Sequence, residues 1–197
     1  MSVQARRRGF TLIELMVALA IVALLLMLGV PSFTTFVRNS EIRSTSESII
    51  NGLRAATAEA ANRNRPVTFE LASATGADWK IWVPDEDDDT KKLTIQEYSK
   101  KEAGANTQIN LTPAGQLSVR FDGLGRVVNP GTDDHIQLIC IFIAGSVGDA
   151  CLPVDEYRPL QIIVDDSKNP PIAGKPRGLR MCDPDPALAK LNDPRAC

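Results

Sequence analysis

The chain has 197 residues, 44% hydrophobic and 23% charged, with 22 lysines and arginines against 24 aspartates and glutamates, a formal net charge of −2. This length suits one anchor helix and one domain of ordinary size. The near balance of charge argues against bulk attraction to nucleic acid, and the single histidine has no serine or cysteine motif beside it, so we do not expect an enzyme.

The first predicted element is an apolar helix over residues 10–30, which follows Arg6-Arg7-Arg8 and Gly9. At about 1.5 Å per residue, a helix of this length covers the roughly 30 Å of bilayer hydrocarbon. The arginines before it predict a cytoplasmic amino terminus, with everything beyond Pro31 outside. The alternative is an ordinary secretory signal, but there the small residue follows a shorter apolar core, whereas Gly9 precedes this one.

Glu14 is the single ionisable residue in the apolar run. Placing a carboxylate inside a membrane costs on the order of a few kcal/mol, so Glu14 needs either a partner of opposite charge or a proton. This makes Glu14 a candidate functional residue. The alternative is a plain single-pass anchor whose glutamate lies near the membrane interface.

The run Gly9-Phe10-Thr11-Leu12-Ile13-Glu14 resembles the processing site of type IV prepilins and type II secretion pseudopilins. The resemblance implies that residues 1–9 are a leader, that a prepilin peptidase cleaves between Gly9 and Phe10, and that the new amino group of Phe10 is methylated. It also implies that Glu14 meets the terminal amine of a neighbouring subunit when the helix leaves the inner membrane for the filament core. Low dielectric favours such a pair over a lone carboxylate.

Residues 31–65 are predicted to continue the helix, which Pro31 should kink rather than end. One face has apolar or small residues at helical spacing, and it needs a sheet to cover it. These residues are Ile42, Ile49, Leu53, Ala56 and Ala60. The other face carries mixed charge and is expected to be solvated. Pro66 should close the helix, because the residue before a proline avoids the helical region.

Residues 66–197 change to a period of two, with short runs rich in β-forming residues. Strands are predicted at 67–71, 79–83, 93–98, 117–121, 126–128, 136–143 and 160–164, with His135 read as the start of a strand. Trp79 and Trp82 are three apart, so they should face opposite sides of their strand. Because no βαβ alternation occurs, the predicted fold class is α+β: a long N-terminal helix packed by its C-terminal half on antiparallel β-sheet.

Five consecutive acids, residues 85–89, lie between the second and third predicted strands. They could bind Ca²⁺, but the glycine and distal glutamate of the EF-hand loop are missing. We therefore interpret the run as a solvated hairpin tip.

Four cysteines, Cys140, Cys151, Cys182 and Cys197, lie in the last third of the chain and would be outside the cytoplasm, where disulfides form. Of three pairings, we favour Cys140 with Cys151 and Cys182 with Cys197, because each closes a short local loop. Such loops contribute about 2 to 3 kcal/mol each in the chain-entropy model. No Cys-x-x-Cys spacing occurs, so we expect neither a metal site nor a cofactor.

The run Phe121-Asp122-Gly123-Leu124-Gly125-Arg126-Val127 is similar to a hairpin of the GspH/FimT class of minor pilins and pseudopilins, and Asp122-Gly123 favours a tight turn by itself. The segment from Gly178 to Cys197 resembles the C-terminal region of the FimT/FimU type. With the prepilin-like amino terminus and the cysteine pairs, these resemblances imply a minor pilin of that subclass.

Some FimT-like proteins are understood to bind DNA through a Gly-Arg-x-Arg run before the first cysteine of this C-terminal loop. Here the positions read Arg177-Gly178-Leu179-Arg180, so only Arg180 is in register. Lys175, Arg177 and Arg180 are therefore candidate DNA contacts through phosphates. The alternative is that these cations keep a loop soluble or dock the next subunit, and no aromatic residue is interleaved to stack on bases.

We expect a minor pilin subunit of a type IV pilus, which helps to start assembly or forms part of the tip. The regions would be the leader, the filament-core helix (10–30), its amphipathic continuation (31–65) and a periplasmic domain (66–197). Two alternatives stay open: a minor pseudopilin of type II secretion and a DNA-binding minor pilin. The expected partners are other pilins, prepilin peptidase and the inner membrane, before transfer to a pilus or pseudopilus.

Overall fold

The computed structural model describes residues 9–85, 88, 91–99, 106–144, 151–152, 157–165, 167, 178–191 and 193–197, without the side chains of 28–29 and 31–32. The chain divides into two compact units, Met1–Val37 and Arg38–Cys197. Most of the predicted leader, residues 1–8, lies outside the described residues.

The residues of helix α1 (Leu12–Arg63) belong to both units: residues 12–37 to the first and residues 38–63 to the second. It continues through Pro31, as predicted. It ends three residues before Pro66, and Asn64 there has a φ of 49°, the left-handed conformation that often follows a helix. The amide of Arg65 donates to the carbonyl of Ala60 at 3.2 Å and satisfies part of the helix end.

No helix within the described residues is both long enough and apolar enough to cross a membrane. The membrane span expected over residues 10–30 therefore stays a prediction.

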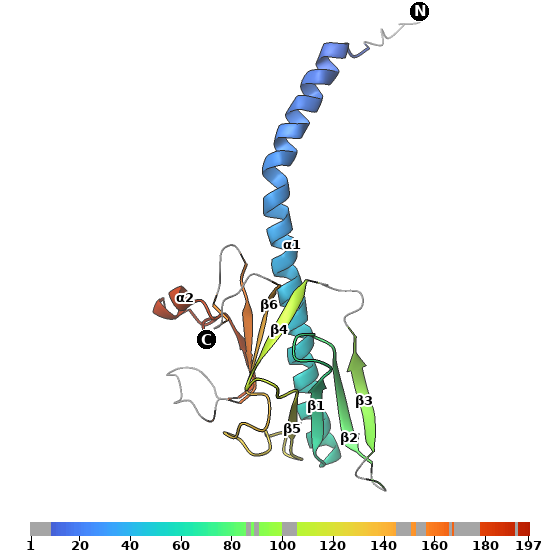
Figure 1. Ribbon diagram of the computed structural model, residues 1–197, viewed down its shortest axis with the longest axis vertical. Coiled ribbons are helices and arrows are strands. Elements are labelled where there is room, and N and C mark those ends of the chain that lie inside the picture. Colours follow the sequence, from blue (N-terminus) through green and yellow to red (C-terminus); the bar gives the residue numbers. More distant parts are fainter. Residues whose placement is uncertain are drawn as a thin grey trace, which may run out of the picture. The chain divides into compact units, whose positions relative to one another are not determined.

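The second unit contains two antiparallel four-stranded sheets, which confirm the α+β class (Figure 1). The first has the order β3 (Lys92–Tyr98), β2 (Trp79–Pro84), β1 (Val67–Leu71), β5 (Ser118–Phe121). The second has the order β4 (Thr107–Thr112), β6 (Leu138–Ile143), β7 (Leu160–Ile163), β8 (Arg180–Cys182). A short helix, α2 (Pro186–Lys190), follows β8.

The core of the second unit forms between α1 and the inward faces of the two sheets. All five residues of the predicted apolar stripe on α1 are fully buried: Ile42, Ile49, Leu53, Ala56 and Ala60. They join one cluster with strand residues of both sheets, among them Phe69, Ile81, Ile109, Ile139 and Ile162. Full burial of an isoleucine or leucine side chain is worth about 1.5 to 3 kcal/mol, so the larger residues of this stripe stabilise the packing of α1 on the sheets.

The two tryptophans of β2 face opposite sides, as predicted. Trp79 is buried, and its indole Nε1 donates to Ser48 Oγ on α1 at 3.2 Å. Trp82 faces the other side, where its Nε1 donates to Glu70 Oε2 at 2.6 Å and the Lys92 ammonium lies 4.3 Å from its ring centroid. Charge-assisted bonds to Glu70 therefore hold Trp82 against its sheet.

Two strand assignments need correction, and three elements were missed. Residues 126–128 form only a single bridge, between Val127 and Phe121. The strand expected at 136–143 begins at Leu138, so His135 is not its start but a buried loop residue. β4, β8 and α2 were not predicted.

The two disulfides join Cys140 to Cys151 and Cys182 to Cys197, which confirms the favoured pairing. The second loop contains α2, whose N-cap Asp185 accepts a hydrogen bond from the amide of Ala187 at 2.8 Å. Pro186 in the first turn suits this position because a missing N–H costs nothing there. The disulfide thus closes a capped helical turn onto the end of β8.

Candidate functional site

The predicted processing site lies at the start of α1. Gly9 and Phe10 precede the helix, and Phe10 is 85% exposed. The amide of Glu14 donates to Thr11 Oγ1 at 3.3 Å, and the amide of Thr11 lies 3.5 Å from Glu14 Oε2. This reciprocal arrangement is a capping box. It places the Glu14 carboxylate beside the exposed N–H groups at the amino-terminal end of the helix, where a negative charge is favourable.

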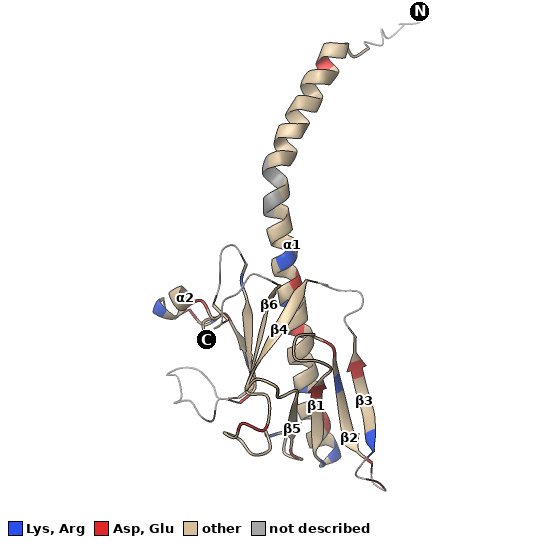
Figure 2. Ribbon diagram, in the orientation of Figure 1, with Lys and Arg blue, Asp and Glu red and all other residues tan. Residues whose placement is uncertain are grey.

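The first unit presents an unpartnered apolar surface. Every large hydrophobic side chain described between Phe10 and Val37 is exposed. Glu14 is the one charged residue in that stretch, and Figure 2 shows how sparse charge is along this part of α1. An exposed apolar surface of this extent marks a protein or membrane contact in a stable protein.

In the second unit, the start of the helix is fixed to the segment that precedes β7. Arg38 Nη1 donates to the Tyr157 hydroxyl at 2.8 Å, and its guanidinium lies 5.6 Å from the Tyr157 ring centroid. Asn39 Oδ1 accepts from the amide of Arg158 at 3.0 Å. These contacts join residues 119 positions apart in sequence, so the domain holds α1 from its first turn in this unit.

The predicted hairpin is built on Asp122. Its Oδ1 accepts from the amides of Leu124 and Arg126, both at 2.9 Å, and Arg126 Nη2 lies 3.1 Å from Oδ2. The amide of Arg126, followed by that of Leu124 and by the Arg126 guanidinium, lowers the pKa of Asp122 below its usual value. A Cβ on Gly125, where φ is 74°, would lie 2.9 Å from Thr57 Cγ2, so the turn packs directly on α1.

A hollow of about 780 Å³, mostly apolar, lies beside this hairpin. One wall is α1, through Arg54, Thr57, Ala58 and Ala61; the others are the hairpin, Pro130, three residues at and after the end of β7 (Val164, Asp165 and Ser167) and residues 178–179. The charged face of α1, which includes Arg54, was predicted to be solvated, and the hollow was not predicted because its walls come from segments far apart in the chain.

Of the three candidate DNA contacts, Lys175 and Arg177 lie outside the described residues. Arg180 is half-buried in β8 and lines a second hollow whose wall on α1 includes Glu47 and Arg54.

The acidic run is only partly described. Asp88 pairs with Lys91 at 3.4 Å, and the amide of Asp85 donates to the carbonyl of Lys91 at 3.0 Å, which is the geometry of a hairpin tip. Residues 86–87 and 89 lie outside the described residues. Within the described part of the chain, no group of three or more histidines, cysteines or acids could hold a metal ion.

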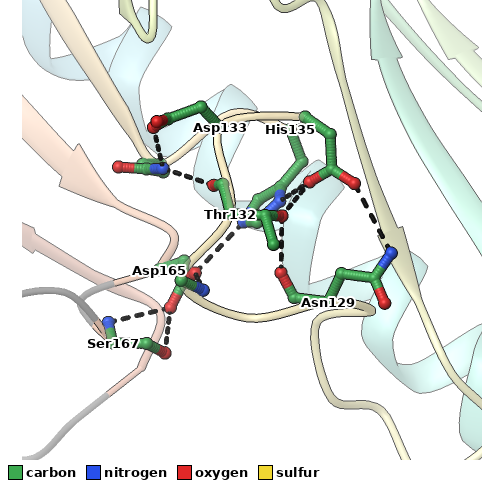
Figure 3. A network of polar contacts seen from close by, with 9 residues as sticks. Asn129, Thr132, Asp133, His135, Asp165 and Ser167 are labelled. Atoms are coloured by element: carbon green, nitrogen blue, oxygen red, sulfur yellow. Dashed lines mark hydrogen bonds and ion pairs between the residues drawn. The ribbon is translucent and has the colours of Figure 1, made fainter.

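Sequence reasoning missed two features. The capping box is readable as Thr11-x-x-Glu14 ahead of an apolar run, a signal that was available. The second is a polar network around buried His135, which binds Asp134 and Asp165 (Figure 3). Asp165 lies 30 residues from His135, so no local pattern predicts that pair.

Two protein-family models match this chain. Residues 4–30 match the prokaryotic N-terminal methylation motif, which defines a prepilin-class amino terminus. Residues 45–167, more than half of the chain, match the type II transport protein GspH. The chain belongs to the GspH family. This confirms the family inferred from the hairpin and the processing site.

Among solved structures, the chain is similar to the type IV minor pilin FimU of Pseudomonas aeruginosa strain PAO1. The identity is 19%, the TM-score is 0.46, and the match covers 65% of this chain and 86% of that one. No curated protein matches the chain.

Proposed function

We propose that the chain is a minor pilin subunit of a type IV pilus, which acts in the initiation of assembly or in the tip complex. Its apolar helix would leave the inner membrane and pack among the helices of other pilins. The proposed role is structural, not enzymatic. The observation that carries it is an exposed apolar surface from Phe10 to Val37, with one acid, directly after a prepilin-type cleavage motif.

The proposed order of events follows from this surface. Prepilin peptidase cleaves between Gly9 and Phe10, and the amine of Phe10 is methylated while the helix is anchored in the membrane with its domain in the periplasm. In the filament, Glu14 meets the amine of a neighbouring subunit. Burying an unpaired carboxylate is costly, so this pairing would select one register between helices. The capping box supports the proposal because it holds Glu14 at the amino-terminal turn.

A minor pseudopilin of type II secretion is the second candidate. The description of the matched family, a type II transport protein, favours it. It would use the same cleavage and the same helix burial, and it would differ in the filament that it joins. Of the candidate DNA contacts, only Arg180 lies within the described residues, so a DNA-binding role stays a prediction.

Deletion of the gene in the parent organism separates the two candidates. For a pilus subunit, we expect surface pili to fall in number while secretion of type II substrates continues at the parental level. Electron microscopy of pili and activity of a secreted enzyme in the medium are the measurements, with the plasmid-borne gene as the control for restoration. Loss of secretion with normal pili would contradict the pilus proposal and support the pseudopilin.

A further inference from the structure

β8 is the last strand of the second sheet, and β7 is its one neighbour among the described strands. The other edge of β8 is located by the next residue, Asp183. The amide of Asp183 donates to the carbonyl of Arg195 at 2.7 Å, and its carbonyl accepts from the amide of Cys197 at 2.9 Å. Backbone groups alternate between the two edges along a strand, so those of Met181, two residues back, point to the same outer edge.

This outer edge is open before Asp183. Within the described part of the chain, the outward N–H and C=O groups of Met181 have no backbone partner, and neither have those of Leu179, one step further back. Unpaired groups on a strand edge are a template for pairing with another extended chain. The edge is short, so the choice of a particular chain has to come from the surface beside it.

That surface is a groove between β8 and α1. The second hollow, of about 500 Å³, is lined by residues 179–181 on one side and by α1, from Glu47 to Arg54, on the other. The hollow beside the hairpin shares Leu179 and Arg54 with it. The two hollows therefore adjoin, and together they form one groove along residues 47–61 of α1, here called the β8 groove. An edge strand beside a helix is the setting in which several peptide-binding domains add a strand.

The wider end of the β8 groove is apolar. Ala58 and Ala61 of α1 line it, together with Val127 and Leu124 of the hairpin. Leu124 is 70% exposed, although it lies beside this apolar hollow. Exposed apolar surface of this kind favours a partner that brings an apolar side chain to cover it.

The wall that the two hollows share carries a cation, Arg54. Within the described residues, Arg54 has no hydrogen bond or ion pair. The other charged side chains of the groove have contacts inside the chain: Arg126 with Asp122, Glu47 with Arg43, Asp165 with the amides of Gly131 and Ser167, and Arg180 as well. The charge that complements this groove is therefore a carboxylate that reaches Arg54.

We propose that the β8 groove binds an extended segment of a partner protein, which adds as a strand to the outer edge of β8. The segment places a carboxylate on Arg54 and an apolar side chain in the hollow beside the hairpin. Both side chains face α1, so they stand two residues apart in the segment. Main-chain bonds to Met181 hold the segment, and these alternate side chains select it. The inference goes beyond the proposed function, because it depends on the domain and not on the apolar helix.

The test uses the full chain, labelled with ¹⁵N, in detergent micelles. The probe is the peptide acetyl-Lys-Val-Thr-Glu-Thr-Val-Lys-amide, whose side chains have the same order in both directions of the strand. We expect a saturable shift of the Met181 amide and slower hydrogen exchange there, because the peptide supplies its missing partner. The amides of Arg180 and Cys182 point to β7, so their exchange should not change. The same peptide with its five central amides N-methylated has no donors there and should not bind.

Two variants test the carboxylate. Arg54→Ala should weaken binding of the peptide about fivefold, as expected for an exposed ion pair. Arg54→Glu should prefer the analogue in which lysine replaces the central glutamate. Arg63→Ala is the matched control, because Arg63 is an exposed arginine of α1 that pairs with Glu59 and does not line the groove, so it should bind as the unmodified chain does.

Met181→Pro tests the strand edge, since proline removes the outward N–H and leaves the pairing of β8 with β7 in place. We expect it to abolish binding. Unchanged affinity in Arg54→Ala, or equal binding of the N-methylated peptide, would overturn the proposal. The absence of any shift at Met181 in the unmodified chain would overturn it too, and is the result expected if residues 168–177 or a second copy already fill the groove.

Discussion

Replacement of Glu14 by alanine is expected to leave cleavage after Gly9 intact and to remove the chain from filaments. The reason is electrostatic: the amine of a neighbour would lie in the apolar filament core without its carboxylate. Removing one partner of a buried ion pair costs about 3 to 5 kcal/mol, which is more than a hundredfold in an association constant. The measurement is the amount of the chain in sheared filaments, compared with the processed chain in the membrane fraction.

Two further variants separate the charge of Glu14 from its role in the capping box. Glu14→Gln keeps a side chain that can complete a capping box but removes the charge. Thr11→Ala removes the cap, at a cost of about 1 kcal/mol, and keeps the carboxylate. We expect Glu14→Gln to be excluded from filaments and Thr11→Ala to enter them. Wild-type amounts of Glu14→Ala in filaments would show that the ion pair is not needed.

Replacement of Gly52 by valine is expected to destabilise the domain by about 3 kcal/mol, at the upper end of the usual cost of overpacking. A Cβ at Gly52 would lie 2.9 Å from two ring atoms of Trp79 and 3.0 Å from Phe69 Cε2. Trp79 has little room to retreat, because its ring stacks on Tyr98 at 5.8 Å and tilts on Phe69 at 5.6 Å. Denaturant unfolding with the disulfides intact, followed by tryptophan fluorescence, measures the loss.

Ala58→Val is the matched control for this substitution. Ala58 lies on the same helix but is exposed, so valine there brings only the modest helical cost of a β-branched residue. We expect a loss below about 1 kcal/mol. Equal stability of Gly52→Val and the unmodified chain would mean that α1 does not approach β2 as closely as described.

The features that the sequence predicted correctly all rest on local signals in the chain. The stripe from Ile42 to Ala60 recurs at helical spacing, and each residue in it is fully buried. β1 matches its predicted bounds because a β-rich run follows Pro66 directly. The disulfides could be paired because each joins cysteines only 11 or 15 positions apart.

The errors have a different physical origin. β4 alternates buried and exposed residues, but polar Thr107 takes one of its three buried positions, which weakens the apolar signal. β8 has three residues, and its place depends on pairing with β7. The division of the strands into two sheets depends on pairings such as β1 with β5, between residues about 50 positions apart. Alternation along one strand carries no information on its partner.

His135 illustrates the same limit at the level of a single residue. Its place before an apolar run suggested the start of a strand, whereas the structure buries it in a loop. A buried polar ring needs hydrogen-bond partners, and one of them, Asp165, comes from the segment after β7. Only the tertiary structure brings these two residues together.

The central claim is that the mature chain begins at Phe10 and retains its apolar helix for assembly. Intact-mass and N-terminal peptide spectrometry of the native protein from sheared filaments tests this most directly. The predicted species lacks residues 1–9 and starts with an N-methylated Phe10. A chain that still carries residues 1–9, or one that has lost residues 10–30, would contradict the account.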